Sequence, residues 1–270
     1  TANDSTVCNG LLLYAVTNID IDRCEANGTT LRTARPTSNN QTVGATGIFI
    51  ISAQNLRMHN CTAHETTHVF SLPDQTQLSG PEGIFLLAVD KAVVSHCQAN
   101  NTQVLSGSGN IACGFAIDSS TNILVKDCKV IDTCLKTQRG QAYGFMAFSP
   151  NTDIAYEHCI STGTNARDFA VGFTTFKDFI TNSSVANTRI TFKNCCANNS
   201  SADKAFGFEL AGGTEQCTIS DSYAKNNSSV GFQIGGVGGG FVVQQATLLR
   251  NCAEKNGIGF LVQGVGETIN

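Results

Sequence analysis

The sequence predicts an all-β protein whose chain winds as a solenoid of stacked coils. Three observations support this prediction: a glycine followed by a large apolar residue recurs along the chain, a cysteine follows at a nearly constant distance, and apolar and polar residues alternate between the two. All three features are present in Gly114–Val130, GFAIDSSTNILVKDCKV. Self-similarity with a period of about 20 to 50 residues is typical of solenoids and related repeat architectures.

The glycine and cysteine signals define the repeat. The glycine signal occurs at Gly10-Leu11, Gly47-Ile48, Gly83-Ile84, Gly114-Phe115, Gly144-Phe145, Gly172-Phe173, Gly207-Phe208, Gly231-Phe232 and Gly259-Phe260, with a mean spacing of about 31 residues. The cysteine signal follows at Cys24, Cys61, Cys97, Cys128, Cys159, Cys195 and Cys252, and Ser222 replaces it once. In the first four repeats the glycine and the cysteine are 14 residues apart, and a distance held this constant indicates a structural origin.

The alternation within each repeat predicts three short strands. Phe115 and Ile117 lie one and three positions after their glycine, which is the period-two pattern of a strand. Ile123 and Val125 lie five and three positions before their cysteine and predict a second strand. The residue directly before each cysteine is polar, so we expect a corner there, and the cysteine then begins a third strand. The corner residues are Arg23, Asn60, His96, Asp127, His158, Asn194, Asp221 and Asn251.

Stacking such coils pairs each strand in parallel with its equivalent in the next coil, at about 4.8 Å. We therefore predict a single-stranded, right-handed, three-faced parallel β-helix of about eight to nine coils, with residues 1–270 forming one domain. A free solenoid needs polar caps over its end coils, and neither end of the sequence offers one, so we expect the chain to belong to a longer protein. Leucine-rich repeats are excluded because their L-x-x-L-x-L-x-x-N pattern is absent.

The repeat pattern G-F…N-I-x-[VI]-x-[DN]-C-x-A-x-N resembles the β-helix repeats of the pectate-lyase-like superfamily over nearly the whole chain. The resemblance implies the right-handed parallel β-helix fold but no single activity, because that superfamily includes lyases, hydrolases, epimerases, adhesins, phage tailspikes and non-catalytic modules. The paired-Asp hydrolase pattern is not recognised: Asn151-Thr152-Asp153 reads NTD, but no partner Asp-Asp or G-H-G follows. No coil supplies the three clustered acids of a calcium-dependent lyase.

Composition excludes several classes of function. The net charge of −4 and the lack of a basic run argue against a nucleic-acid surface, and no apolar run approaches the length of a membrane span. Seven of the twelve cysteines belong to the ladder, and cysteines stacked about 4.8 Å apart with parallel Cβ vectors do not suit disulfides, so we expect these seven to be buried thiols. The other five, Cys8, Cys113, Cys134, Cys196 and Cys217, lie off the ladder, no C-x-x-C supports zinc, and we expect no cofactor. Buried thiols favour an intracellular location, whereas N-x-S/T sequons and the fold resemblance favour a secreted or surface one, and localisation stays open.

The segment from each cysteine to the next glycine shortens along the chain, with 22, 21, 16, 15, 12, 11, 8 and 6 intervening residues. Long loops from one corner of a β-helix stack into a wall and form a groove beside a strand face, which suits an extended polymer. The long N-terminal loops carry the chemically capable side chains Arg32, Arg35, His64, Glu65, His68, Asp74 and Glu82. The alternative interpretation is that these loops only cover the surface.

Two sets of residues are candidates for acid–base chemistry. The first is His64, His68 and Asp74 in the long loops. The second is the corner ladder, in which His96, Asp127 and His158 follow one another on successive coils and could perturb each other's pKa. The alternative is that these corner residues only form hydrogen bonds with one another and with the turn backbone.

No metal site is predicted. His64 and His68 would share a face only on a helix, and the intervening Thr66 and Thr67 disfavour one. Asp20 and Asp22 share an outward strand face like a calcium-binding pair, but Arg57 and His59 lie opposite them one coil on, and charge pairing explains them. The run GGVGGG at 235–240 is a flexible insertion and not a dinucleotide loop, because no βαβ unit follows.

The residues two positions after each glycine should face outward, yet the first of them are apolar. They are Leu12, Phe49, Phe85, Ala116, Met146, Thr174, Glu209, Gln233 and Leu261. Exposed apolar strips mark contacted or covered surface, so the strip predicts a contact with a ligand, a protein partner, another copy of the chain or the long loops.

The sequence therefore favours a non-catalytic β-helix module. We expect it to bind a glycan or a protein along the loop-walled groove of its N-terminal half, using Arg32, Arg35, Glu65, Glu82, Phe49 and Phe85. One alternative is a polysaccharide lyase or glycoside hydrolase acting in the same groove. A second is a structural spike or stalk segment that forms homo-oligomers through Leu12, Phe49 and Phe85.

Overall fold

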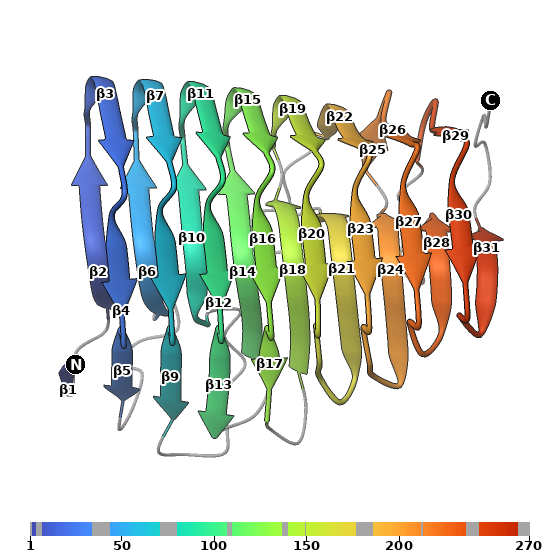
Figure 1. Ribbon diagram of the computed structural model, residues 1–270, viewed down its shortest axis with the longest axis horizontal. Coiled ribbons are helices and arrows are strands. Elements are labelled where there is room, and N and C mark those ends of the chain that lie inside the picture. The colour runs from blue at the N-terminus through green and yellow to red at the C-terminus, as the bar shows by residue number, and fades with distance from the viewer. Residues whose placement is uncertain are drawn as a thin grey trace.

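The computed structural model is a parallel β-helix, whose coils follow one another along the long axis from the N-terminus to the C-terminus (Figure 1). Its described part contains strands and turns and no helix. The structure describes residues 2–3, 7–33, 44–70, 80–106, 110–136, 140–148, 150–176, 186–211, 213–235 and 243–263.

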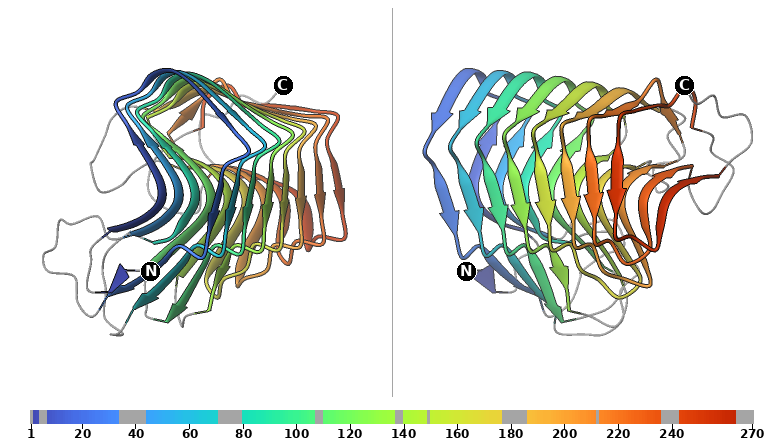
Figure 2. Two further views of the ribbon diagram at one scale, coloured as in Figure 1. Left: turned by 60° about the vertical axis from the view of Figure 1, so that its left-hand side comes forward. Right: turned by 45° about the vertical axis from the view of Figure 1, so that its right-hand side comes forward.

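Four parallel sheets, here sheets A to D, run along the stack (Figures 1 and 2). Sheet B consists of β2 (Val7–Tyr14), β6 (Gly44–Ile51), β10 (Glu82–Leu87), β14 (Asn110–Asp118), β18 (Gly140–Phe148), β21 (Phe169–Phe176), β24 (Lys204–Leu210), β28 (Val230–Ile234) and β31 (Ile258–Val262). Sheet C consists of β3 (Thr17–Asp22), β7 (Gln54–His59), β11 (Asp90–Ser95), β15 (Thr121–Lys126), β19 (Thr152–Glu157), β22 (Asn187–Lys193), β26 (Thr218–Ser220) and β29 (Thr247–Leu249), with β25 (Thr214–Glu215) also paired to β22. Sheet D consists of β4 (Glu25–Asn27), β8 (Thr62–His64), β12 (Gln98–Asn100), β16 (Lys129–Ile131), β20 (Ile160–Thr162), β23 (Cys196–Asn198), β27 (Tyr223–Lys225) and β30 (Cys252–Glu254). Sheet A consists of β1 (Ala2–Asn3), β5 (Thr30–Thr33), β9 (Thr67–Phe70), β13 (Gln103–Ser106) and β17 (Cys134–Leu135).

Sheets B, C and D are the three predicted faces, and sheet A adds a fourth strand to the N-terminal coils. Figure 1 shows its strands only in the blue-to-green half of the stack. The segments predicted as long loops therefore begin as strands. Their apolar residues Leu31, Val104 and Leu135 are buried and pack against Ala45 and Ala112 of sheet B. These two clusters form a small core beside sheet A, which supplies the burial that holds the fourth strand in place.

Identical side chains stack along the interior of the helix. Phe145 and Phe173 lie with ring centroids 4.8 Å apart and nearly parallel planes, because each follows the glycine of its coil. The stack continues through Phe208, Phe232 and Phe260 at 4.9 Å per step. The register of the parallel strands thus sets the ring spacing.

The cysteine ladder follows the same register. The backbone N–H of Cys61 donates to Cys97 Sγ at 3.4 Å, and that of Cys97 donates to Cys128 Sγ at 3.4 Å. All twelve cysteines are free thiols. Burial raises the pKa of Cys61 to about 11 and that of Cys217 to about 12, so these thiols stay protonated at neutral pH.

The predicted corner residues adopt left-handed backbone conformations, as Asn60 does with φ 55°. The last coil departs from the prediction by one residue. Arg250 is the corner residue, with φ 51°, and Asn251 occupies the cysteine row, where its Oδ1 accepts a hydrogen bond from the Ser222 N–H at 3.0 Å. Placing Cys252 in the ladder was therefore wrong: it pairs with Tyr223 and is exposed. A shift of one residue moves a side chain to the opposite face of a strand.

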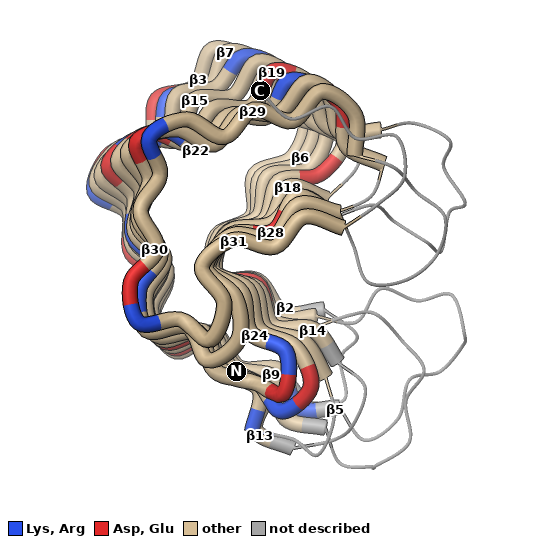
Figure 3. The backbone as a smooth tube through the Cα atoms, turned by 90° about the vertical axis from the view of Figure 1, so that its right-hand side faces the viewer, with Lys and Arg blue, Asp and Glu red and all other residues tan. Residues whose placement is uncertain are grey.

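The repeated glycines lie where sheet B touches sheet D. A Cβ on Gly47 would lie 2.6 Å from Ala63 Cβ and 2.6 Å from the Gly83 carbonyl oxygen. A Cβ on Gly83 would meet Ala99 Cβ and the Gly114 carbonyl oxygen at the same distances. Only glycine permits this approach. Sheet B therefore bends toward sheet D in the view down the axis (Figure 3), and it separates the main core from the small core beside sheet A.

Replacing Gly83 by alanine should destabilise the protein by about 1–3 kcal/mol, because the new methyl group has no space between sheets B and D. Gly259→Ala is the matched control. It lies in the same row at the open end, where a Cβ would meet only Ala253 Cβ at 3.6 Å, an ordinary contact distance. Thermal unfolding followed by circular dichroism should show a lower Tm for Gly83→Ala than for Gly259→Ala. Equal Tm values would contradict the close contact.

Thiol accessibility should follow the burial of the ladder. Ellman's reagent should modify all twelve thiols in denaturant without reductant, because none is in a disulfide. In the folded protein the exposed Cys252 should react first, and the seven buried cysteines should react only as the chain unfolds. A denatured count below twelve would show that disulfides form.

Candidate functional site

Sheet B bends at its row of glycines, and its outer side is therefore concave (Figure 3). Because of this bend, residues on both sides of each glycine point outward. Two rows of side chains define this concave face. The inner row is Asn9, Thr46, Glu82, Cys113, Tyr143, Val171, Phe206, Val230 and Ile258. The outer row is Leu12, Phe49, Phe85, Ala116, Met146, Thr174, Glu209, Gln233 and Leu261. Members of both rows pack together as one apolar cluster outside the main core.

The N-terminal half of the concave face is apolar and partly open. Phe49 and Phe85 stack with ring centroids 4.9 Å apart and planes inclined by 3°, and both are half-buried. Leu12, one coil earlier, is 49% exposed. These are the three apolar residues that the sequence singled out, and the structure places them side by side on the outer surface of sheet B.

Glu82 lies beside this aromatic pair in the inner row. Thr46 Oγ1 donates a hydrogen bond to Glu82 Oε2 at 3.1 Å. Burial raises the pKa of the Glu82 carboxyl to about 8, although the Thr46 hydrogen bond acts in the opposite direction. The side chain is half-buried. Glu82 is thus a carboxyl that is largely protonated at neutral pH in a partly open face.

A second unusual carboxyl lies in the C-terminal half of the concave face. Thr174 Oγ1 donates to Glu209 Oε2 at 3.0 Å, and burial raises the pKa of Glu209 to about 7. Glu209 is 5% exposed and its neighbours Thr174 and Gln233 are fully buried. Tyr143 donates a hydrogen bond to Gln141 Oε1. Glu209 was expected only as an outward-facing residue and Tyr143 was not a candidate, because the sequence does not show that this half of the face is buried.

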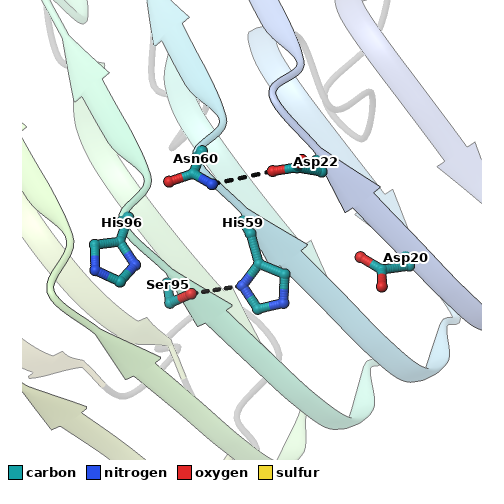
Figure 4. Close-up of a pocket in the computed structure, with 6 residues that line it drawn as sticks. All are labelled: Asp20, Asp22, His59, Asn60, Ser95 and His96. Atoms are coloured by element: carbon teal, nitrogen blue, oxygen red, sulfur yellow. Dashed lines mark hydrogen bonds between the residues drawn. The ribbon is translucent and has the colours of Figure 1, made fainter.

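A separate pocket lies where sheet C meets sheet D in the first three coils (Figure 4). It has a volume of about 570 Å³ and is lined by Asp20, Asp22, His59, Asn60, Ser95 and His96. Asp22, His59 and Ser95 hold equivalent positions on β3, β7 and β11, and form one row across the three strands. His59 Nδ1 lies 2.6 Å from Ser95 Oγ. These residues and Asn60 are drawn with their hydrogen bonds in Figure 4.

The acidic end of this pocket is ordered by hydrogen bonds. Asn60 Nδ2 donates to Asp22 Oδ1 at 3.0 Å, and Arg23 Nε lies 2.9 Å from Asp22 Oδ2. The Asn60 hydrogen bond, helped by Arg23 and by the charge of His59, lowers the pKa of Asp22 against the effect of desolvation. Asp22 is therefore a carboxylate directed at Asn60 and Arg23, and it is close enough to His59 for the two charges to interact.

The structure brings the predicted corner ladder together next to this pocket. His96 Nε2 lies 3.8 Å from Asp127 Oδ2, and His158 Nδ1 lies 4.0 Å from Asp127 Oδ1. Asn194 Nδ2 extends the row to His158 Nε2 at 3.3 Å. All four side chains are at least partly exposed.

The loop candidates do not converge. His64 on β8 is half-buried and lies 3.5 Å from Glu65, whereas His68 on β9 is buried in line with Leu31 and Val104. Burial lowers the pKa of His68 to about 3, so it stays neutral. The prediction of long loops was wrong at these positions, because strands of sheets A and D send alternate side chains to opposite faces.

The remaining candidates are also separated. Arg32 is exposed on β5, and Glu82 belongs to sheet B. Arg35 and Asp74 lie outside the described residues. Asn151 is a buried structural residue, whose amide donates to the Ile117 carbonyl oxygen at 3.0 Å. Within the described ranges no group of three or more His, Cys, Asp or Glu side chains is arranged to hold a metal ion. The same ranges contain no helix that is long and apolar enough to cross a bilayer.

A family model described as the right-handed β-helix region matches residues 8–253, and the chain belongs to this family. A comparison with curated proteins finds no match.

Several solved structures are similar in fold. The catalytic domain of a GH87 α-1,3-glucanase in complex with nigerose is 13% identical with a TM-score of 0.39, and the match covers 98% of this chain and 62% of that one. The A-module of a mannuronan C-5 epimerase from Azotobacter vinelandii is 9% identical with a TM-score of 0.37, covering 94% and 78%. Endopolygalacturonase I from Stereum purpureum is 12% identical with a TM-score of 0.29, covering 93% and 95%. The chain thus spans less than two thirds of the glucanase domain, and likeness at this level concerns the fold and not the activity.

The raised pKa of Glu82 has a measurable consequence for stability. Between its ordinary pKa of 4.5 and about 8, Glu82 is protonated in the folded chain and ionised in the unfolded chain, so its contribution to stability falls as the pH rises through this range. Glu82→Gln should therefore lose less Tm than the wild type between pH 5 and pH 8.5. The exposed Glu25→Gln is the control and should follow the wild type. An identical pH dependence for Glu82→Gln would contradict the burial of this carboxyl.

Proposed function

We propose that the protein binds an extended carbohydrate along the concave face of sheet B, with its main contact in the N-terminal half. The observation that carries this proposal is the stacked Phe49–Phe85 pair beside the protonated Glu82 and Thr46, on the partly open part of the face. This conclusion extends the sequence prediction by assigning the groove to one sheet.

The chemistry of this surface suits a sugar chain. Aromatic side chains bury large areas and combine an apolar face with a defined geometry, which matches the C–H face of a pyranose ring. A carboxyl group such as that of Glu82, which the buried Thr46 hydroxyl orients, forms hydrogen bonds with sugar hydroxyls. The exposed residues of the N-terminal half, Leu12, Phe49 and Phe85, lie on three adjacent strands about 4.8 Å apart, so the open part of the face is long enough for a short segment of a sugar chain.

Hydrolysis in the same groove is the second candidate, and Glu82 is the observation that favours it. A carboxyl protonated at neutral pH can act as a general acid. Glycoside hydrolases use two carboxyl groups about 5–10 Å apart. Glu209 cannot be the partner, because four coils separate it from Glu82, a distance of about 19 Å at 4.8 Å per coil. Binding without cleavage is therefore the leading proposal, and a lyase or hydrolase remains the alternative.

Substituting the aromatic pair should weaken carbohydrate binding. A glycan array followed by calorimetry on the best ligand should show an increase in Kd of about tenfold for Phe49→Ser or Phe85→Ser, because each substitution removes one aromatic contact. Val93→Ser is the control, since Val93 is 38% exposed but lies on sheet C. Equal losses for all three variants, or no glycan bound by the wild type, would refute the proposal.

The same variants separate the alternatives. Release of reducing ends or of unsaturated products that Glu82→Gln abolishes would establish the enzyme. A change in oligomeric state in Phe49→Ser, seen by light scattering, would assign the apolar residues to contact between copies and support the structural role instead.

A further inference from the structure

The row formed by Asp22, His59 and Ser95 places a carboxylate, an imidazole and a hydroxyl group on three adjacent strands. Their positions pair directly in the parallel register, Asp22 with His59 and His59 with Ser95. Neighbouring strands lie about 4.8 Å apart, so each side chain can reach the next. A hydroxyl group next to an imidazole, with a carboxylate one strand further on, is the set of groups used for nucleophilic catalysis.

The serine and the imidazole of this row are in direct contact. Ser95 Oγ and His59 Nδ1 are 2.6 Å apart, within the range expected for a nucleophile and its general base. Asp22 is hydrogen-bonded to Asn60 at 3.0 Å and paired with Arg23 at 2.9 Å, and its charge acts on His59 through space and not through a hydrogen bond. Ser95 is 8% exposed and opens into the pocket of about 570 Å³ shown in Figure 4.

We propose that this pocket is a catalytic site for the hydrolysis of short acyl esters, with Ser95 as nucleophile, His59 as general base and Asp22 as a nearby negative charge that stabilises the protonated imidazole. The site is on sheet C and is independent of the carbohydrate-binding face of sheet B. The pocket is lined by polar and charged side chains, which suits a small acyl group on a polar alcohol and not a long acyl chain.

In the first step Ser95 Oγ attacks the carbonyl carbon of the ester and its proton passes to His59 Nδ1. The bond between this carbon and the alcohol oxygen then breaks, and the proton on His59 passes to the leaving alcohol. Water attacks the acyl-serine and gives one proton to His59 Nδ1, which returns it to Ser95 Oγ as the carboxylic acid leaves. Asp22 stabilises the imidazolium formed in both halves of the reaction.

The backbone around Ser95 does not supply an oxyanion hole. The Asn60 N–H donates to the Ser95 carbonyl oxygen at 3.1 Å, and the His96 N–H donates to the Lys126 carbonyl oxygen at 3.1 Å. Side chains must therefore stabilise the oxyanion, and the exposed Lys126 occupies the next position of the row after Ser95. Loss of an oxyanion donor costs about 100- to 1,000-fold in kcat, so the esterase should be slow. Covalent labelling is accordingly a more sensitive readout than turnover.

The chain contains a matched control for the nucleophile. Ser220 lies in the same row and is also 8% exposed, but its neighbours in the row are Lys193 and Leu249. A serine activated only by its place on the sheet would thus react equally at both positions. Activation by His59 predicts reaction at Ser95 alone.

The test is labelling of the whole folded protein with a fluorophosphonate probe, peptide mass spectrometry of the labelled site, and hydrolysis of p-nitrophenyl acetate. The wild type and Ser220→Ala should label at Ser95 and hydrolyse the ester at the same slow rate. Ser95→Ala should lose the label, and His59→Gln should lower the labelling rate about 100-fold. Circular dichroism should confirm that each variant is folded.

Asp22 is tested by the isosteric Asp22→Asn, which should lower kcat by about tenfold or more and leave KM unchanged, whereas a merely structural role would change the two together or neither. No labelling of the folded wild type, labelling at Ser220, or unchanged hydrolysis by Ser95→Ala would overturn the proposal. Glycan binding by Ser95→Ala should equal that of the wild type, so the failure of this site and the failure of the carbohydrate face are separate results.

Discussion

The contact between sheet B and sheet D along the row of glycines is the constraint on which the rest of the structure depends. Gly47 faces Ala63 and Gly83 faces Ala99 of sheet D at distances that leave no space for a Cβ, and within this row only Gly259, at the open end, has an ordinary contact distance. The contact bends every strand of sheet B in the same place. It also divides the interior into a main core filled by stacked phenylalanines and a small core that supports sheet A.

The bend determines the chemistry of the outer surface. A straight strand would send alternate residues inward, but the bend turns Glu82 and Phe85, on either side of Gly83, toward the same concave face. Carboxyl groups are thereby placed among apolar side chains, and burial raises the pKa of both Glu82 and Glu209. A surface with stacked aromatic rings and protonated carboxyls is thus a consequence of the same contact that closes the core. We regard it as the natural location for a neutral, hydroxyl-rich ligand.

In sheet C the candidate site is formed by side chains on adjacent strands, each one coil apart. The parallel register places equivalent positions of successive coils next to one another. The residues of one row are therefore separated in the sequence by the length of one repeat. Asp22, His59 and Ser95 become neighbours although 73 residues separate the first from the last. Ser220 occupies the same row without an imidazole beside it. The function of a row therefore depends on which residues follow one another, and not on the position itself.

The sequence by itself determined the repeat, the strands of sheets B, C and D, the cysteine ladder through Cys195 and the outward position of Phe49 and Phe85. These features follow from spacing and from period-two alternation, which are local properties of the chain. Only the tertiary structure decided that His68 lies in a core between sheets A and B, that Glu82 shares a face with Phe85, and that Asn251 and not Cys252 continues the ladder. Alternation predicts that neighbouring residues of a strand lie on opposite faces of the sheet, but it does not predict which face is buried. That choice depends on a long-range contact at each glycine and on a register that a single residue can shift.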